Sequence, residues 1–213
     1  MAGRSLIRKK VRGAYHHGDL KAALKNAALR LVGEKGPRGF SLNEASRLAG
    51  VTAGAPYRHF PDKDALLAAI ATDGNELLTK EIRESVVKVK ELKGKMIEAG
   101  MAYLRFSKYH SDYFTVIFNA GLDKSKYPAF ARSAREAFGT IFELSARFES
   151  TPELAVQRAC AAWALVHGLA TLSLDGGLSI VLPEKPAFEH LRPILEQFLS
   201  RPARAARKKS QSC

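Results

Sequence analysis

The sequence predicts an all-α protein, because helical periodicity recurs along most of the chain and no strand-and-hairpin pattern appears. Its first apolar stripe, from Leu20 to Leu31, repeats every three or four residues, which is the spacing of one helix face. The chain of 213 residues is long enough for one medium domain or two small ones. Its 46% hydrophobic and 26% charged residues are typical of a globular protein, and no apolar run is long enough to cross a membrane.

The positive charge of the chain is concentrated at its two ends. The net charge is +13, and residues 1–63 hold thirteen Lys or Arg against four Asp or Glu, a net +9. Residues 64–200 carry a net −1 and residues 201–213 a net +5. A near-neutral body with a basic N-terminal third is typical of a module that meets a polyanion.

A helix-turn-helix motif is predicted over residues 41–60. Ser41 followed by Glu44 is a capping box, which fixes the start of the first helix. Gly50 can adopt the left-handed conformation that ends this helix, and Thr52 is a good N-cap for the second. Two short helices joined by a tight turn have the geometry that places the second helix in the major groove of DNA.

The predicted second helix, residues 53–59, carries most of the candidate DNA contacts. Very small side chains at its start let the backbone approach DNA, with the helix N–H groups near phosphate. Tyr57, Arg58 and His59 can each donate a hydrogen bond to phosphate, and Arg58 could also reach a guanine edge. Lys63 opposes the dipole of the next helix, which a phosphate partner would explain. The predicted DNA-binding residues are Ser41, Thr52, Ala53, Gly54, Ala55, Tyr57, Arg58, His59 and Lys63.

The segment from Tyr15 to Ile70 resembles the N-terminal domain of the TetR/AcrR family of bacterial repressors. The resemblance is carried by the runs "ALKNAALRLVGEKG", "SLNEASRLAGV" and "APYRHFPDKDAL" and by their spacing. It implies that Tyr57, His59 and Lys63 bind phosphates and that residues 52–55 lie at or near base edges.

Two residues depart from the family pattern. Pro56 stands where Leu is usual, at the fourth position of the predicted helix, where only the first intrahelical bond is lost. Ala53 stands where polar, base-reading side chains are common. Direct base readout is then expected from Arg58, Thr52 and the backbone, or from DNA shape.

The chain divides into four predicted segments. Residues 1–16 form a disordered basic arm, residues 17–78 the helix-turn-helix DNA-binding domain, residues 85–200 a helical regulatory and dimerisation domain, and residues 201–213 a disordered basic tail. The helices predicted in the regulatory domain are 93–109, 111–120, 127–149, 153–174 and 187–200.

The last two of these helices, 153–174 and 187–200, are the predicted homodimer interface. The later one has a single apolar stripe, whereas the earlier one is apolar on two sides and is therefore expected to be buried on both. A dimer also supplies the two recognition elements that a palindromic DNA site requires. The run from Trp163 to Leu169 resembles the C-terminal domain of a TetR/AcrR branch named for a Trp-His-Gly pattern. The resemblance implies that this half dimerises and holds a small-molecule inducer.

Aromatic side chains, Tyr103 among them, are concentrated in the middle helices, which suits a ligand cavity. Each could equally belong to an ordinary core, and His167 could be a hydrogen-bonded helical histidine or a ligand- or pH-sensing group. His110 and Asp112 alone are too sparse a set to indicate a metal site, and no cofactor is expected. The predicted pocket residues are Phe106, Tyr109, Tyr113, Phe114, Phe118, Phe138, Phe142, Trp163 and His167.

These patterns together predict a transcriptional regulator that binds double-stranded DNA. The leading hypothesis is a homodimeric repressor of a palindromic operator that a small molecule releases, and the alternative is a non-specific architectural nucleic-acid binder. No catalytic motif is present, so the protein is not expected to be an enzyme. Only two cysteines and no signal peptide predict a reducing, cytoplasmic location.

Overall fold

The computed structural model describes residues 20–180 and 188–199, and every regular element within them is helical. The predicted basic arm (1–16) and basic tail (201–213) lie outside the described residues. No helix in the described part is both long and apolar enough to span a membrane. The all-α prediction is confirmed.

Eight α-helices and four short 3-10 turns follow one another along the described chain. The regulatory helices begin and end within three residues of their predicted bounds, except that a 3-10 turn precedes the last one. The elements are α1 (Leu20–Lys35), α2 (Leu42–Leu48), η1 (Pro56–Arg58), α3 (Lys63–Val87), α4 (Leu92–Tyr109), α5 (Ser111–Asn119), η2 (Lys124–Lys126), α6 (Pro128–Ala146), α7 (Pro152–Leu174), η3 (Gly177–Ile180), η4 (Phe188–Leu191) and α8 (Arg192–Leu199).

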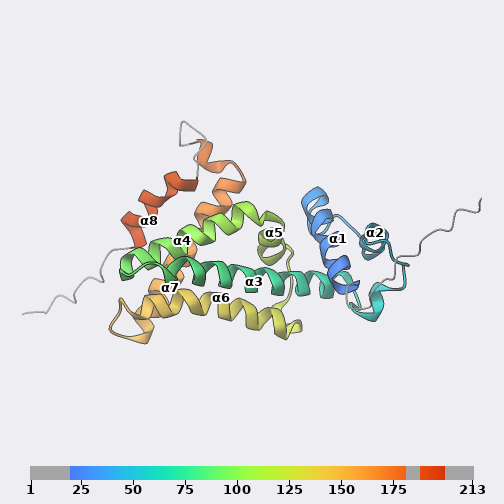
Figure 1. The fold of residues 1–213 in the computed structure, drawn as a ribbon, viewed down its shortest axis with the longest axis horizontal. Helices are drawn as coiled ribbons and strands as arrows, with labels where there is room; N and C mark the ends of the chain where they lie inside the picture. The colour runs from blue at the N-terminus through green and yellow to red at the C-terminus, as the bar shows by residue number, and fades with distance from the viewer. Residues whose placement is uncertain (1–19, 181–187, 200–213) are drawn as a thin grey trace, which may run out of the picture.

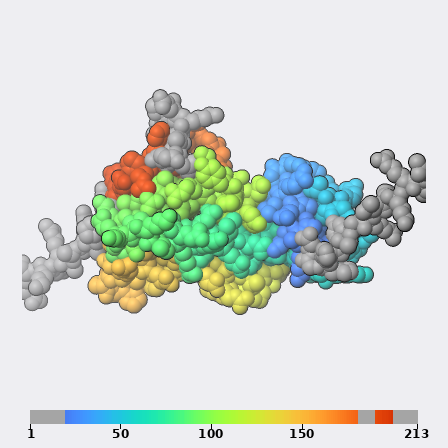
Figure 2. Space-filling view, in the orientation of Figure 1, coloured from blue at the N-terminus to red at the C-terminus, as the bar shows by residue number. Residues whose placement is uncertain are grey.

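Helix α3 is the axis of the molecule and connects its two parts (Figure 1). Its N-terminal part lies beside α1, which in turn packs against α2, and its remainder lies along α4, α5 and α6. The helix continues without a break through residues 79–84, which separated the two predicted domains. The N-terminal helices form one end of an elongated molecule (Figure 2), and one continuous hydrophobic core extends from α1 to α8.

Side-chain caps fix where three of the helices begin. Ser41 caps α2, Asp62 caps α3 through a 2.7 Å bond from the Ala65 N–H to its carboxylate, and Thr151 caps α7. Each cap satisfies a backbone N–H that the first turn of a helix leaves without a partner. The sequence predicted the Ser41 cap, which is confirmed.

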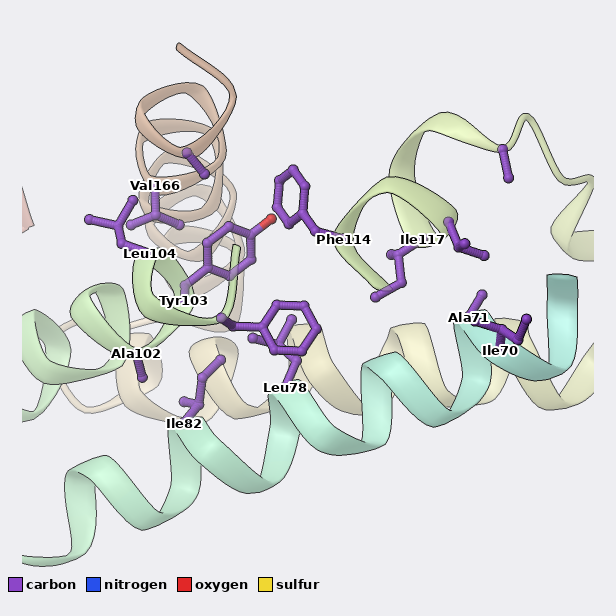
Figure 3. Packing of buried hydrophobic residues seen from close by; sticks show 14 of the residues in the cluster. Ile70, Ala71, Leu78, Ile82, Ala102, Tyr103, Leu104, Phe114, Ile117 and Val166 are labelled. Carbon is purple, nitrogen blue, oxygen red and sulfur yellow. The ribbon is translucent and has the colours of Figure 1, made fainter. Parts of the chain in front are cut away.

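Glycine allows the regulatory helices to approach each other closely. A Cβ added at Gly100 in α4 would lie 2.9 Å from Leu195 Cδ1 of α8 and 3.2 Å from Val166 Cγ1 of α7. Helices α7 and α8 therefore both reach α4 at the position where it has no side chain. Figure 3 shows Val166 beside Tyr103 and Leu104 of α4, with Leu78 and Ile82 of α3 on the other side.

Candidate DNA-binding surface and ligand cavity

The first helix of the helix-turn-helix motif is held by a complete capping box. The Glu44 N–H donates to Ser41 Oγ at 3.2 Å, and the Ser41 N–H donates to Glu44 Oε2 at 2.8 Å. Lys35 at the end of α1 donates to Glu44 Oε1 at 2.8 Å, which ties α1 to α2. The hydrogen bonds from Lys35 and then from Ser41 lower the pKa of Glu44 to about 2. The carboxylate is therefore ionised wherever DNA binding is of interest.

The predicted recognition helix over residues 53–59 is wrong in form. After Gly50, whose φ of 72° supplies the expected left-handed turn, the chain makes turns and then one 3-10 helix, η1, that starts at Pro56. Because Pro56 has no N–H, it cannot bond to the Thr52 carbonyl, which is bonded instead by Ala55 N–H at 3.0 Å. The proline thus starts the helical segment and does not sit inside it.

This shorter turn still presents the predicted contact residues on the surface. Thr52, Ala53, Gly54 and Arg58 are exposed, as is Tyr57, whose exposed fraction is 54%. Two other residues of the segment, Pro56 and Phe60, are buried and anchor it to the core. Buried Pro56 and Phe60 therefore hold the segment from which Tyr57 and Arg58 are exposed. Of the remaining predicted residues, Ser41 is exposed, and Ala55 and His59 are half-buried.

Lys63 has partners within the protein that the sequence did not predict. Its ammonium donates to the Phe40 carbonyl at 3.0 Å and to the Arg38 carbonyl at 3.2 Å, and it lies 5.2 Å from the centre of the Phe40 ring. These carbonyls explain a cation in the first turn of α3 without any phosphate. A phosphate contact from Lys63 would come from an ammonium that is already held in place.

The loop between α1 and α2 is fixed to the rest of the molecule by the same group of contacts. Arg38 donates to Asp64 Oδ1 at 2.6 Å, and its other terminal nitrogen donates to the Gly121 carbonyl at 3.4 Å. Asp64 is in the first turn of α3, and Gly121 follows α5. The DNA-binding end is therefore bonded to the regulatory half as well as continuous with it.

The regulatory half contains a cavity of about 600 Å³ that is lined by residues of α3, α4, α5, η2, α6, α7 and α8. Four of the predicted pocket residues line it: Phe118, Phe138, Phe142 and Trp163. Phe138 and Trp163 meet edge to face, with ring centres 6.1 Å apart. A volume of this size falls in the range of cavities that hold drug-sized ligands, roughly 300–1,000 Å³.

The other five predicted pocket residues do not line the cavity. Phe106 is fully buried in the core, Tyr113 packs near Gly74 of α3, and Tyr109 is 67% exposed at the end of α4. Phe114 and His167 belong to an aromatic cluster behind the cavity wall, with ring centres 5.6 Å apart. The helical spacing places all five in the correct helices, but only the packing of the helices determines which of them reach the empty space.

His167 is a hydrogen-bonded histidine of this cluster. Its Nδ1 lies 2.9 Å from the hydroxyl of Tyr103, which lines the cavity, and its ring centre lies 4.6 Å from that of Phe118. Burial lowers the pKa of His167 and raises the pKa of Tyr103, so both side chains are neutral near pH 7. Figure 3 shows the Tyr103 hydroxyl directed towards Phe114, in the same cluster.

The cavity lining also has a polar part that was not predicted from the sequence. Asn75 of α3 is buried and donates to Ser133 Oγ of α6 at 3.2 Å, while Lys124 of η2 and Arg135 of α6 also line the cavity. The charged residues gave no signal, because a lysine or arginine in a helical sequence is most often solvated. The space itself depends on small residues facing it, such as Ala99 and Ala131, which the sequence marks only as helix formers.

Two family models match the chain on either side of α3. The model for bacterial regulatory proteins of the tetR family matches residues 24–70, and the model for the tetracyclin repressor-like C-terminal domain matches residues 96–193. The chain belongs to the TetR family. Members of this family are DNA-binding transcription regulators and not enzymes, so the DNA-binding and non-enzyme predictions are confirmed at that level. The Trp-His-Gly branch stays a prediction.

Solved structures share the whole architecture of this TetR-family chain. A protein of unknown function from Rhodococcus sp. RHA1 is 25% identical with a TM-score of 0.73, covering 89% of this chain and 100% of that one. A transcriptional regulator from the same organism is 26% identical with a TM-score of 0.65, covering 83% and 92%. The fatty acid degradation regulator FadR from Bacillus halodurans, at 14% identity and a TM-score of 0.70, covers 92% and 100% and shows the fold alone. No curated protein matches the chain significantly.

Proposed function

We propose that this TetR-family regulator is a repressor that binds a palindromic operator as a homodimer and is released by a small molecule. The observation that carries the proposal is the continuity of α3. This helix starts five residues after η1, and three of its later residues, Asn75, Leu78 and Ile82, line the cavity. About 18 Å of helix separates Lys63 from Asn75, at about 1.5 Å per residue.

A ligand in the cavity would act on α3 directly. If the ligand favours a position of α3 that differs from the DNA-bound one, the helix carries the motif with it, because α1 packs on α3 and α2 packs on α1. The ligand would shift the population of the protein from the DNA-binding arrangement to the other arrangement. The size of this shift is set by the difference between the ligand's affinities for the two arrangements. The hydrogen bonds from Arg38 to Asp64 and to the Gly121 carbonyl also connect the loop between α1 and α2 to α3 and to the end of α5. A movement of α3 would therefore reach the motif through this loop as well.

Exposed apolar side chains on α7 and α8 support the homodimer. Val156, Cys160 and Trp163 lie four and three residues apart along α7, and all three are exposed in the single chain. Phe198 of α8 is also exposed. Water-exposed apolar area of this kind on two helices is typical of a surface that a second copy covers. The dimer would present two η1 turns to half-sites about 34–36 Å apart when these are one DNA turn apart.

The contacts with DNA are assigned to the exposed face of the motif. Tyr57, His59 and Lys63 contact phosphate, the small residues 52–55 lie against the groove, and Arg58 reads base edges. Because the second element is a single turn starting at Pro56, few side chains enter the groove. Specificity is then shared between Arg58 and sequence-dependent DNA shape.

Selection of genomic fragments by the purified protein at moderate salt tests the proposal. We expect enrichment of a short palindrome, protection of two half-sites, and a free protein with twice the mass of the chain by light scattering. Retention of all fragments alike, with strong salt dependence and no specificity ratio, would instead support the architectural binder, which the +9 charge of residues 1–63 favours.

A further inference from the structure

The charged residues of the cavity lining are all of one sign. Lys124 and Arg135 are the only ionisable side chains there apart from Tyr103, and the described lining contains no carboxylate. Apolar and small side chains make up almost all of the remainder. A lining of this composition favours an apolar body that carries negative charge, and it offers a cationic ligand no counter-charge.

Neither cation is neutralised within the described chain. Arg135 has no ion pair there, and Lys124 lies over the Phe130 ring, 5.0 Å from its centre, without a carboxylate partner. Asp123, next to Lys124 in sequence, accepts from the Ser125 N–H at 2.9 Å and from its hydroxyl at 2.7 Å. Arg158 and Arg192 of this half are paired, with Glu149 and Glu98, whereas Arg132 and Arg147 resemble Arg135 in having no ion pair in the described chain.

The polar groups deeper in the cavity are already engaged. Asn75 donates to Ser133, and the Tyr103 hydroxyl is bonded to His167. A ligand therefore gains little by placing a polar group at either position. Its polar group gains most at Lys124 and Arg135, which are both exposed on their own elements and so lie where the cavity meets solvent.

We propose that the cavity binds an amphipathic organic anion. Its apolar body packs among Phe118, Phe138 and Trp163, and its carboxylate or equivalent anionic group binds Arg135 and Lys124 at the rim. Binding stands on the geometry of the cavity alone, whereas the role of such an anion in releasing DNA rests on the proposed function. Charge-assisted hydrogen bonds are the strongest polar contacts available to the ligand, and arginine binds carboxylate through two parallel bonds.

Trp163 provides a direct measurement, because it is the only tryptophan of the chain and lies in the cavity wall. Its fluorescence is followed at pH 7.5 during titration with decanoate, decanol and decyltrimethylammonium, each as a monomer, and with 2-naphthoate by calorimetry. We expect decanoate to bind about tenfold tighter than decanol, in line with a charge-assisted hydrogen bond, and the cation to bind weakest. Equal or tighter binding of decanol or of the cation overturns the proposal, as does failure of both anions to bind.

Substitutions separate the charge from the apolar body. Arg135→Gln should reduce the preference for decanoate over decanol to about twofold and leave the affinity for decanol unchanged, and Lys124→Gln should act in the same direction. Arg132→Gln is the matched control, because Arg132 is exposed on α6 one turn earlier and does not line the cavity. An unchanged preference in both Arg135→Gln and Lys124→Gln overturns the assignment of the anionic group.

Filling the cavity tests where the probe binds. Ala134 lines the cavity, and Ala134→Phe should weaken binding of decanoate and decanol alike, measured by calorimetry. Undiminished binding places the probe elsewhere and overturns the proposal. Operator binding is measured separately: a protein that binds decanoate but selects no operator retains this inference and loses the proposed function. A protein that selects an operator but binds neither anion overturns this inference and leaves the DNA-binding part of the proposed function intact.

Discussion

The DNA-binding part and the regulatory part of α3 both contain buried side chains, but the surroundings of these side chains differ. Ile70, near the DNA-binding end, and Ile82, near the other, are both buried, yet only Ile82 lines the cavity. Because Ile82 is only 1% exposed, most of its side chain is packed and only a small part of it meets the cavity. The DNA-binding end is built to hold one shape, whereas the regulatory half leaves room for another molecule.

The largest expected difference between the two parts of α3 is in the stability lost when each isoleucine is truncated to alanine. We expect Ile70→Ala to lower the free energy of unfolding by about 3–4 kcal/mol, because it opens a new hole in a filled core. Ile82→Ala should cost about 2 kcal/mol, since the space it opens adjoins the cavity, where neighbouring side chains can shift to fill it more easily than in a filled core. Denaturant unfolding of both variants measures the difference. Equal losses would mean that the cavity is closed in solution.

The sequence was sufficient for the features that depend on local chemistry. The bounds of the regulatory helices, the Ser41 cap and the Gly50 turn follow from residue type and spacing, and all were predicted. The form of residues 53–59 was not predicted correctly. Pro56 was expected inside a helix, whereas it is the first residue of a 3-10 helix.

Features that depend on packing were beyond prediction from the sequence. The aromatic residues lie in the helices predicted for them. However, Tyr109 is exposed to water and Phe106 is buried in the core, while Phe138 and Trp163 line the cavity. The rotation of each helix about its axis decides this, and that rotation is set by distant contacts such as those at Gly100. For the same reason the carbonyl partners of Lys63 could not be foreseen from its position in α3.

The second prediction concerns the surface of the DNA-binding end. Tyr57→Phe should weaken operator binding about tenfold, through loss of one phosphate hydrogen bond of about 1–1.5 kcal/mol, without changing the dependence of affinity on salt. Arg58→Ala should cost about 1–3 kcal/mol, lower the salt slope by about 1 and reduce discrimination between bases. Arg83→Ala, which removes an exposed charge from the far end of α3, is the control and should change neither.

Fluorescence anisotropy at several salt concentrations, with the operator and with mutated sites, measures these effects. If Arg58→Ala weakens binding to every site by the same factor, Arg58 contacts only phosphate, and specificity rests on DNA shape. If Tyr57→Phe has no effect, η1 does not contact the backbone of DNA, and the assignment of this turn to the interface is wrong.

The third prediction compares one helix cap from each half. Ser41→Ala and Thr151→Ala each remove a side chain that accepts a backbone N–H, at 3.2 Å and 3.3 Å, and each should cost about 1 kcal/mol of stability. Only Ser41→Ala should also weaken DNA binding, because α2 supports the turn that carries Tyr57. Thermal unfolding and anisotropy distinguish the two effects. A loss of DNA binding in Thr151→Ala as large as in Ser41→Ala would show that stability alone explains it.

The smallest expected effect is a difference in how the two ends respond to acid. Burial lowers the pKa of His167 below its usual 6.5, so the unfolded chain takes up a proton at a higher pH than the folded one. Above pH 6.5 the side chain is neutral in both states and contributes no pH dependence, and as the pH falls below 6.5 it destabilises the fold. His167→Gln, which retains a partner for the Tyr103 hydroxyl, should make stability less dependent on pH between 8 and 5.

Glu44 should act in a separate and lower range. Its pKa is lowered from 4.5 to about 2, so its contribution is fully present above pH 4.5 and is lost as the pH falls towards 2. Glu44→Gln should therefore flatten the stability profile below pH 4.5 and leave the range from 8 to 5 as in the wild type. Denaturant unfolding across pH measures both variants. A change in the higher range in Glu44→Gln, or none there in His167→Gln, would mean that another group titrates, and that the cavity half is not the part of the molecule that first responds to acid.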